Sequence, residues 1–223
     1  MKDLAEGVLR NPRYPPEWPY SPIDFERQDE SDDSLFYSQP RLVYHIDEFA
    51  VAALTKYYAR NFKDGEDVLD VCSSWVSHYP EDWRGGNVVG LGMNELELGE
   101  NGRLSSYVVR DLNEDPTLPF PDGSFGTVLC TEVVEHIPFP DRALREFRRI
   151  LAPGGVLIGM TPAKNPIWSL RFLSSSCPHS EPFHNNYTTA EVREMLGASG
   201  LAPTSVRYTF GRLSVAFVAE RRP

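Results

Sequence analysis

The chain has 223 residues, of which 41% are hydrophobic, and its formal net charge is −10. This composition is typical of one globular domain and excludes wholesale disorder. The negative charge argues against a nucleic-acid partner, because binding phosphates requires clustered Lys and Arg. No apolar run reaches the ~18 residues that a membrane span requires, so no membrane-spanning segment is expected.

The three cysteines are odd in number and widely spaced, so they predict no disulfide framework. The first ten residues lack the apolar stretch of a secretory signal. We therefore expect a protein of the cytoplasm or of an organelle interior, and not a secreted one.

Residues 1–40 predict a proline-rich, aromatic N-terminal arm. Six prolines between positions 12 and 40 favour extended chain over a helix or a central strand. Trp18, Tyr20 and Phe36 are too apolar for a free linker, so we expect the arm to lie against a domain formed by residues 41–223.

After the arm, helical and strand patterns alternate. Apolar spacing predicts a helix over 41–62, with Val43, Ile46, Phe49 (or Ala50) and Leu54 among the residues on its buried face. Further helices are predicted at 141–151, closed by Pro153-Gly154-Gly155, and at 189–198, and strands at 68–71, 87–91, 107–110, 125–130, 156–160, 204–209 and 213–220. This order predicts an α/β fold with a mostly parallel seven-stranded sheet, helices on both faces and an antiparallel terminal hairpin.

In such a sheet, ligands bind outside the carboxyl ends of the strands, where the strand order reverses. The first and third strands end near Asp70 and Asp111. The second ends near Gly92, and the fourth ends near Thr131. These strand ends define the candidate site.

Three stretches at fixed offsets resemble the class I methyltransferases that bind S-adenosylmethionine, in particular the small-molecule, methyltransferase type 11-like group. They are Leu118–Phe125, Glu132–Pro138 and Arg145–Gly155, and the similarity extends over roughly residues 64 to 221. The resemblance implies a Rossmann-like fold, S-adenosylmethionine as cofactor, and methyl transfer to a small-molecule acceptor.

The resemblance also implies which residues bind the cofactor: Asp70, Cys72, Ser73, Ser74, Trp75, Gly92, Met93, Asn94, Asp111, Leu112 and Thr131. Asp70 would hold the methionine ammonium, and Asp111 would hold the adenine amine. Trp75 is either a wall of the cofactor pocket or a core side chain.

The first loop departs from the family's glycine pattern, because Cys72, Ser74 and Val76 stand where glycines are usual. Ser73 and Ser74 are small enough to donate to the methionine carboxylate at the start of a helix. Gly92 replaces the ribose-binding acid, so Asn94 or Glu95 would have to reach the ribose from a shifted loop.

The segments 36–41 and 73–78 are also similar to a divergent branch of this family found in photosynthetic organisms. This similarity adds the plastid to the compartments that we expect.

Glu132 and His136 lie four residues apart, and one helical turn would place them on the same side. His136 is a candidate general base, since its pKa lies near neutrality, or it forms a structural hydrogen bond. The spacing of Cys177, His179, Glu181 and His184 matches no zinc pattern, so no metal is expected, and the long connection 164–187 predicts a substrate lid.

A second function remains open at this stage. The altered glycines and Gly92 also suit a non-catalytic, methyltransferase-like binding or assembly subunit, with the N-terminal arm contacting a protein partner.

Overall fold

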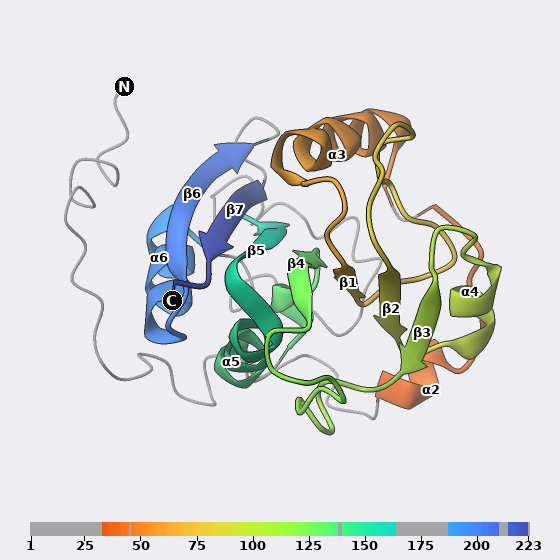
Figure 1. The fold of residues 1–223 in the computed structure, drawn as a ribbon. Coiled ribbons are helices and arrows are strands. Elements are labelled where there is room, and N and C mark those ends of the chain that lie inside the picture. Colours follow the sequence, from red (N-terminus) through yellow and green to blue (C-terminus); the bar gives the residue numbers. More distant parts are fainter. Residues whose placement is uncertain (1–32, 45, 138–139, 164–186, 210–213, 223) are drawn as a thin grey trace.

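The computed structural model describes residues 33–44, 46–137, 140–163, 187–209 and 214–222 (Figure 1). Most of the predicted arm and lid, with Trp18, Tyr20 and the Cys177–His184 cluster, lies outside the described residues. The division into an arm and a domain therefore stays a prediction. No helix among the described residues is long and apolar enough to cross a membrane.

One seven-stranded sheet runs through the molecule (Figure 1). Its strands are β1 (Val68–Val71), β2 (Val88–Gly92), β3 (Ser106–Val109), β4 (Phe125–Thr131), β5 (Leu151–Pro162), β6 (Ala202–Thr209) and β7 (Ser214–Glu220). They lie in the order β3-β2-β1-β4-β5-β7-β6. The first five are parallel, and β7 is antiparallel to both β5 and β6. The predicted sheet with its antiparallel hairpin is confirmed.

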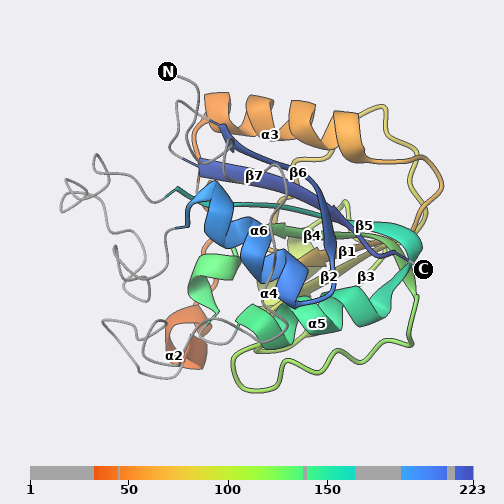
Figure 2. The same ribbon diagram turned by 90° about the vertical axis from the view of Figure 1, so that its left-hand side faces the viewer.

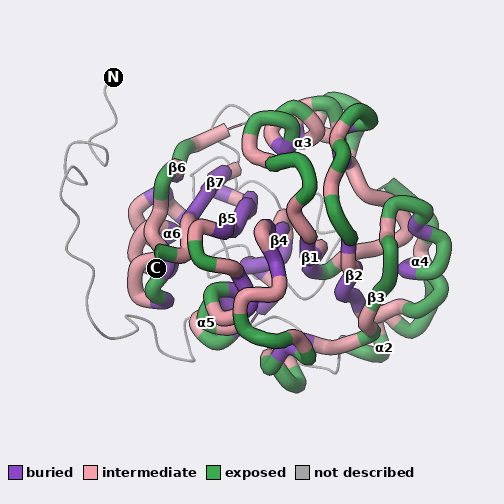
Figure 3. The backbone as a smooth tube through the Cα atoms, viewed as in Figure 1, coloured by how far each residue is buried: buried purple, intermediate pink, exposed green. Residues whose placement is uncertain are grey.

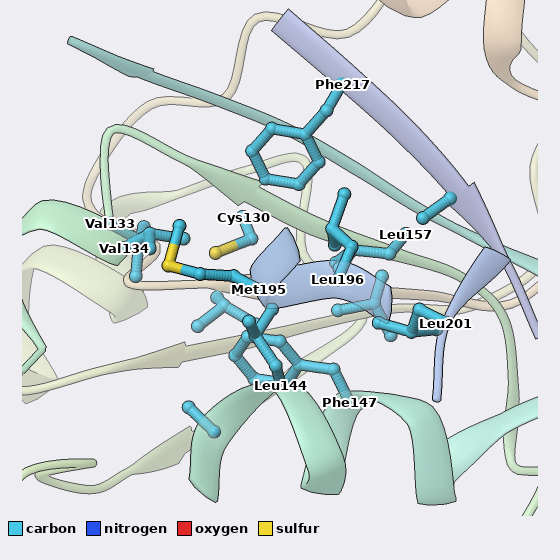
Figure 4. Close-up of a cluster of buried hydrophobic side chains, with 14 of the residues drawn as sticks. Cys130, Val133, Val134, Leu144, Phe147, Leu157, Met195, Leu196, Leu201 and Phe217 are labelled. Carbon is cyan, nitrogen blue, oxygen red and sulfur yellow. The ribbon is translucent and has the colours of Figure 1, made fainter. Parts of the chain in front are cut away.

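Helices cover both faces of the sheet (Figure 2). On one face, α5 (Pro140–Ile150) and α6 (Thr189–Ala198) bury the larger hydrophobic cluster, which includes Phe147, Met195 and Phe217 (Figure 4). On the other face, α3 (Glu48–Asn61) buries Leu54 and Tyr58 against the sheet. Burial is concentrated in the central strands, whereas the edge strand β3 is mostly exposed (Figure 3).

The predicted helix over 41–62 is too long, because Asp47 caps the helix that begins at Glu48. Phe49, expected on its buried face, is 79% exposed, since it lies in the first turn, where α3 extends past the core. The expectation of extended chain is also wrong for the end of the arm, where α2 (Asp33–Tyr37) forms one short helix. Its residues follow the last proline-rich stretch, so nothing prevents helical hydrogen bonding there.

Pro153-Gly154-Gly155 does not stand between α5 and β5, as the sequence pattern suggested. α5 ends at Ile150 and β5 begins at Leu151, so the triplet lies inside β5, close to its start. Gly154 has a φ of 78°, a left-handed conformation that glycine adopts without steric cost.

The connection from β1 to β2 contains no helix, although parallel strands are usually joined by one. Aromatic rings fill the space instead. Phe62, at the end of α3, has its ring centroid 4.8 Å from that of Trp83 and 5.8 Å from that of Tyr79. It also stacks on Tyr58 at 5.0 Å. This face of the sheet is therefore covered by α3 and a layer of rings.

The two phenylalanines at the ends of α3 provide a matched stability test. Phe62→Ala should lower the free energy of unfolding by about 2–4 kcal/mol, because it removes a ring packed against three others. Phe49→Ala should change it by less than about 0.5 kcal/mol. Urea unfolding measures both, and equal losses would contradict this account of the layer.

Candidate functional site

The strand order reverses between β1 and β4, which are neighbours in the sheet although β2 and β3 intervene in the chain. Such a switch point is where open α/β sheets bind ligands. The carboxyl ends of β1, β2, β3 and β4 meet at this edge, because these strands are parallel. The structure thus brings the predicted strand-end residues to one edge of the sheet.

Two residues at the switch point have an unusual backbone. Cys72, directly after β1, has a φ of 54°, and Glu132, directly after β4, has a φ of 55°. Among the described residues they are the only non-glycines with a positive φ. The left-handed conformation costs such a residue roughly 1–2 kcal/mol. Backbone strain is therefore placed on both sides of the site.

Asp70 is the centre of a hydrogen-bond network. One of its carboxylate oxygens, Oδ2, accepts from the hydroxyls of Tyr79 at 2.5 Å, Ser73 at 3.1 Å and Ser77 at 3.1 Å. Burial raises the pKa of Asp70, and these three hydrogen bonds oppose the rise. The other oxygen, Oδ1, has no hydrogen bond from the described residues.

The loop after β1 is held from the other side by α4 (Glu95–Glu100) and the residue that follows it. Glu97 is buried and accepts from the Ser74 hydroxyl at 2.6 Å and from the Arg41 amide at 2.7 Å. Asn101 donates to the Ser74 carbonyl at 2.7 Å and to the Ser77 hydroxyl at 2.9 Å. Sequence reasoning missed Glu97 and Asn101, whose partners lie more than 20 residues away.

This network corrects the expectation that a helix begins in the loop after β1 that contains Ser73 and Ser74, called here the serine loop. No helix begins in the described residues 72–87, so no helix N-terminus faces a carboxylate there. The hydroxyls of Ser73 and Ser74 are engaged by Asp70 and Glu97. The loop is fixed by the protein's own polar groups.

Gly92 and the serine loop depend on each other. The Ser73 amide donates to the Leu91 carbonyl at 2.8 Å, which draws the loop against the end of β2. A Cβ atom at Gly92 would overlap the Ser73 carbonyl oxygen. The space of the family's ribose-binding side chain is therefore filled by backbone.

The neighbours of Gly92 are also placed. Asn94 caps α4 through its side-chain oxygen and donates to the Tyr37 carbonyl at 2.9 Å. Glu95 points to solvent in the first turn of α4, and Met93 is half-buried. Both polar ends of the Asn94 amide thus have protein partners.

Trp75 packs toward the N-terminal segment rather than into either hydrophobic cluster. Its indole N–H donates to the Val43 carbonyl at 3.0 Å, and its ring meets Tyr44 edge-on at 5.1 Å. The half-buried Trp75 thereby ties the serine loop to the segment between α2 and α3.

At the far side of β2, Asp111 accepts from the Asn113 amide at 2.7 Å through Oδ1, and its Oδ2 has no hydrogen bond from the described residues. Leu112 is buried in the larger hydrophobic cluster. At the end of β4, the Thr131 hydroxyl lies 2.8 Å from the hydroxyl of Tyr58.

The expected helical turn from Glu132 to His136 does not form. The short 3₁₀-helix η2 covers only Val134–His136, and the left-handed Glu132 lies outside it. Asn113 donates to the His136 carbonyl at 3.3 Å, which holds this turn against the end of β3. The half-buried His136 remains a candidate base.

Glu135 is an acid that sequence reasoning missed. It is 3% exposed and accepts from the Thr161 hydroxyl at 3.1 Å. Burial and the neighbouring carboxyl of Glu132 raise the pKa of Glu135 well above its usual range. Its position within an apolar run, between Val134 and Ile137, was the available signal.

Comparison with known proteins gives the similarity of this region. Residues 69–159, which contain these strand ends up to β5, match a family model described as a methyltransferase domain. In this region the chain is similar to the class I methyltransferases. A ubiquinone biosynthesis O-methyltransferase from Pseudomonas aeruginosa is 31% identical over 110 residues, which cover 46% of this chain and 47% of that protein.

A sterol 24-C-methyltransferase from Gibberella zeae is 33% identical over 117 residues, 48% of this chain and 31% of that protein. The chain therefore spans less than half the length of both curated relatives.

Solved structures share the fold. A putative methyltransferase from Bacillus halodurans superposes with a TM-score of 0.58 at 17% identity, covering 79% of this chain and 100% of that one. The [4+2]-cyclase SpnF gives a TM-score of 0.62 at 16% identity, covering 85% and 93%.

The contact between Gly92 and Ser73 predicts that position 92 accepts no side chain unless the loop moves. Gly92→Asp should lower the free energy of unfolding of this protein by about 1–3 kcal/mol, because the new side chain must displace the serine loop. Gly102→Asp is the control, since a Cβ there meets nothing within 4 Å. Equal stability of the two variants in urea would contradict the mutual dependence of Gly92 and the loop.

Glu135 predicts a pH dependence of stability. Because its pKa is raised in the folded state, its contribution to stability is full below the unfolded-state pKa, near 4.3, and is lost as the pH rises through the folded-state pKa. Glu135→Gln should therefore gain thermal stability over the natural chain as the pH rises from 5 to 8. Melting curves of this variant and of the exposed control Glu114→Gln test this, and parallel pH profiles would count against it.

Proposed function

We propose that the protein transfers the methyl group of S-adenosylmethionine to a small-molecule acceptor. The observation that carries the proposal is a pair of carboxylates, Asp70 and Asp111. Each has one oxygen that accepts no hydrogen bond from a described residue. Asp70 lies near the end of β1 and Asp111 follows β3, on either side of β2, so strand spacing alone separates them by about 10 Å. The cofactor carries an amine at each of its ends, on the methionine and on the adenine.

The surrounding residues fit some parts of the cofactor better than others. Cys72 keeps the left-handed backbone that glycine would supply at the turn after β1. The half-buried Met93 offers apolar surface for the adenine, whereas Leu112, next to Asp111, is packed in the core. The ribose would lie over Gly92 and the Ser73 carbonyl, without the acid that the family uses.

When bound, the cofactor supplies an electrophilic methyl group. The protein's task is then to align the acceptor and exclude water. An acceptor hydroxyl or amine that must lose a proton needs a base, and His136 and Glu132 at the end of β4 are our candidates. Glu135 interacts with the carboxyl of Glu132, and the two acids would together help to hold a proton near the acceptor.

Small molecules are the acceptor class that the relatives suggest, since the two curated matches are a ubiquinone biosynthesis O-methyltransferase and a sterol 24-C-methyltransferase. The protein partner of the N-terminal arm and the lid over 164–187 stay as expectations from the sequence.

The second candidate is a non-catalytic binding subunit. The engagement of the Ser73 and Ser74 hydroxyls and the missing helix after β1 favour it, because both remove the usual contacts of the methionine carboxylate. The two candidates differ in whether the purified protein binds and turns over the cofactor.

Calorimetric titration with S-adenosylhomocysteine tests the cofactor site. We expect binding, and we expect Asp111→Asn to weaken it roughly tenfold, because the adenine amine loses a charged acceptor. Asp82→Asn, an exposed acid outside the site, is the control and should bind like the natural chain. No heat signal at millimolar ligand would favour the non-catalytic candidate.

Methyl transfer is tested separately. Label from methyl-tritiated S-adenosylmethionine should appear in phenolic acceptors, and His136→Asn should lower kcat about 10²-fold or more if His136 is the base. The same variant should leave the affinity for S-adenosylhomocysteine within about twofold. Binding without label in any acceptor, or equal loss of both, would contradict these assignments.

A further inference from the structure

A cavity of about 380 Å³ opens between α3 and the terminal hairpin, on the face of the sheet opposite α5 and α6. Its walls come from residues 53–60 of α3 and 207–209 of β6, with Met160 of β5 and Ala216 of β7. This volume is within the range of small-molecule sites. The residues of the proposed methyltransferase site do not line it.

Three cations line this cavity: Lys56 and Arg60 from α3, and Arg207 from β6. None of the ten described residues that line it is acidic, although the whole chain carries a net charge of −10. The three charged groups form no ion pair with any residue in the described part of the chain. A formal charge of +3 in an acidic protein is thus gathered around one opening.

The inner wall is apolar and firmly held. Ala53, Leu54, Met160 and Ala216 form it, and Leu54 belongs to the buried cluster beneath α3. The Tyr57 hydroxyl donates to the Phe217 carbonyl at 3.0 Å, so this ring is fixed against β7. The Arg207 guanidinium lies 6.0 Å from the centre of the Tyr57 ring.

We propose that this cavity binds a small organic anion, a carboxylate or phosphate ester on a flat apolar body. The cations at its rim would bind the anionic group, since guanidinium groups match carboxylate and phosphate geometry. The apolar wall and the Tyr57 ring would take the body of the ligand. The anionic group of the ligand thereby meets cations, and its apolar body meets apolar side chains.

This site is separate from the switch point. The cavity lies over β5, β7 and β6, whereas the switch point lies between β1 and β4, roughly 10 Å away by strand spacing. The hydroxyls of Tyr58 and Thr131, 2.8 Å apart, stand between them. A ligand in the cavity and a nucleoside at the switch point are therefore able to bind together.

Calorimetry with phenyl phosphate on the full chain tests the proposal. Phenyl phosphate should bind at least tenfold more tightly than inorganic phosphate or benzyl alcohol, which carry only one half of its chemistry. Raising the ionic strength should weaken the binding, because the cations are near the surface. Saturating phenyl phosphate should leave the affinity for S-adenosylhomocysteine measurable and within a few-fold.

Arg60→Gln and Arg207→Gln should each weaken phenyl phosphate binding about tenfold. Arg145→Gln is the control, since it removes the same charge from an exposed position of α5, on the opposite face. Circular dichroism checks that all three variants fold.

Equal losses in all three variants would reduce the effect to the net charge of the chain and overturn the site. Equal binding of benzyl alcohol, or direct competition with S-adenosylhomocysteine, would overturn it as well. None of these results bears on methyl transfer, which the labelling experiment measures on its own.

Discussion

The carboxylate of Asp70 ties together the parts of this molecule that meet at the end of β1. Three hydroxyls converge on one of its oxygens, and each comes from a different point of the connection to β2. Asp70 is half-buried, and hydrogen bonds replace part of the water that its carboxylate loses, so the three hydroxyls stabilise it together. Tyr79 extends the network into the layer of rings under α3, and Ser77 extends it to Asn101 behind α4. A connection without a helix is held in one conformation by polar contacts with Asp70, together with those that Glu97 and Asn101 make to the same loop.

This arrangement separates two properties that glycine usually combines. The left-handed backbone conformation is found directly after β1, where Cys72 adopts it despite its side chain. The space left by an absent side chain is found at the end of β2, where Gly92 lets the Ser73 carbonyl approach. The left-handed Cys72 and the bare Gly92 therefore both belong to one arrangement of the loop after β1.

The strands were predictable because most of them contain β-branched and aliphatic residues between polar turns, and the structure moves their ends by only a few residues. The strand-end acids followed from the same pattern, since their position depends on topology alone. The contacts that close the site were not predictable, because Glu97 and Asn101 reach Ser74 from a short helix whose polar sequence gives little periodic signal. The helix missing after β1 was expected on family grounds, and no local pattern between residues 72 and 87 indicates one.

Fold alone does not decide the reaction, since a [4+2]-cyclase and a putative methyltransferase share this architecture. Backbone strain is more informative. Cys72 and Glu132 both carry a conformation that glycine would relieve, and both stand at the reversal of strand order. In a scaffold that serves only its own stability, substitution by glycine or asparagine would relieve this strain without other cost. Strain on both sides of this edge of the sheet, beside two carboxylates that each have one oxygen without a hydrogen bond from the described residues, favours a site that binds a ligand.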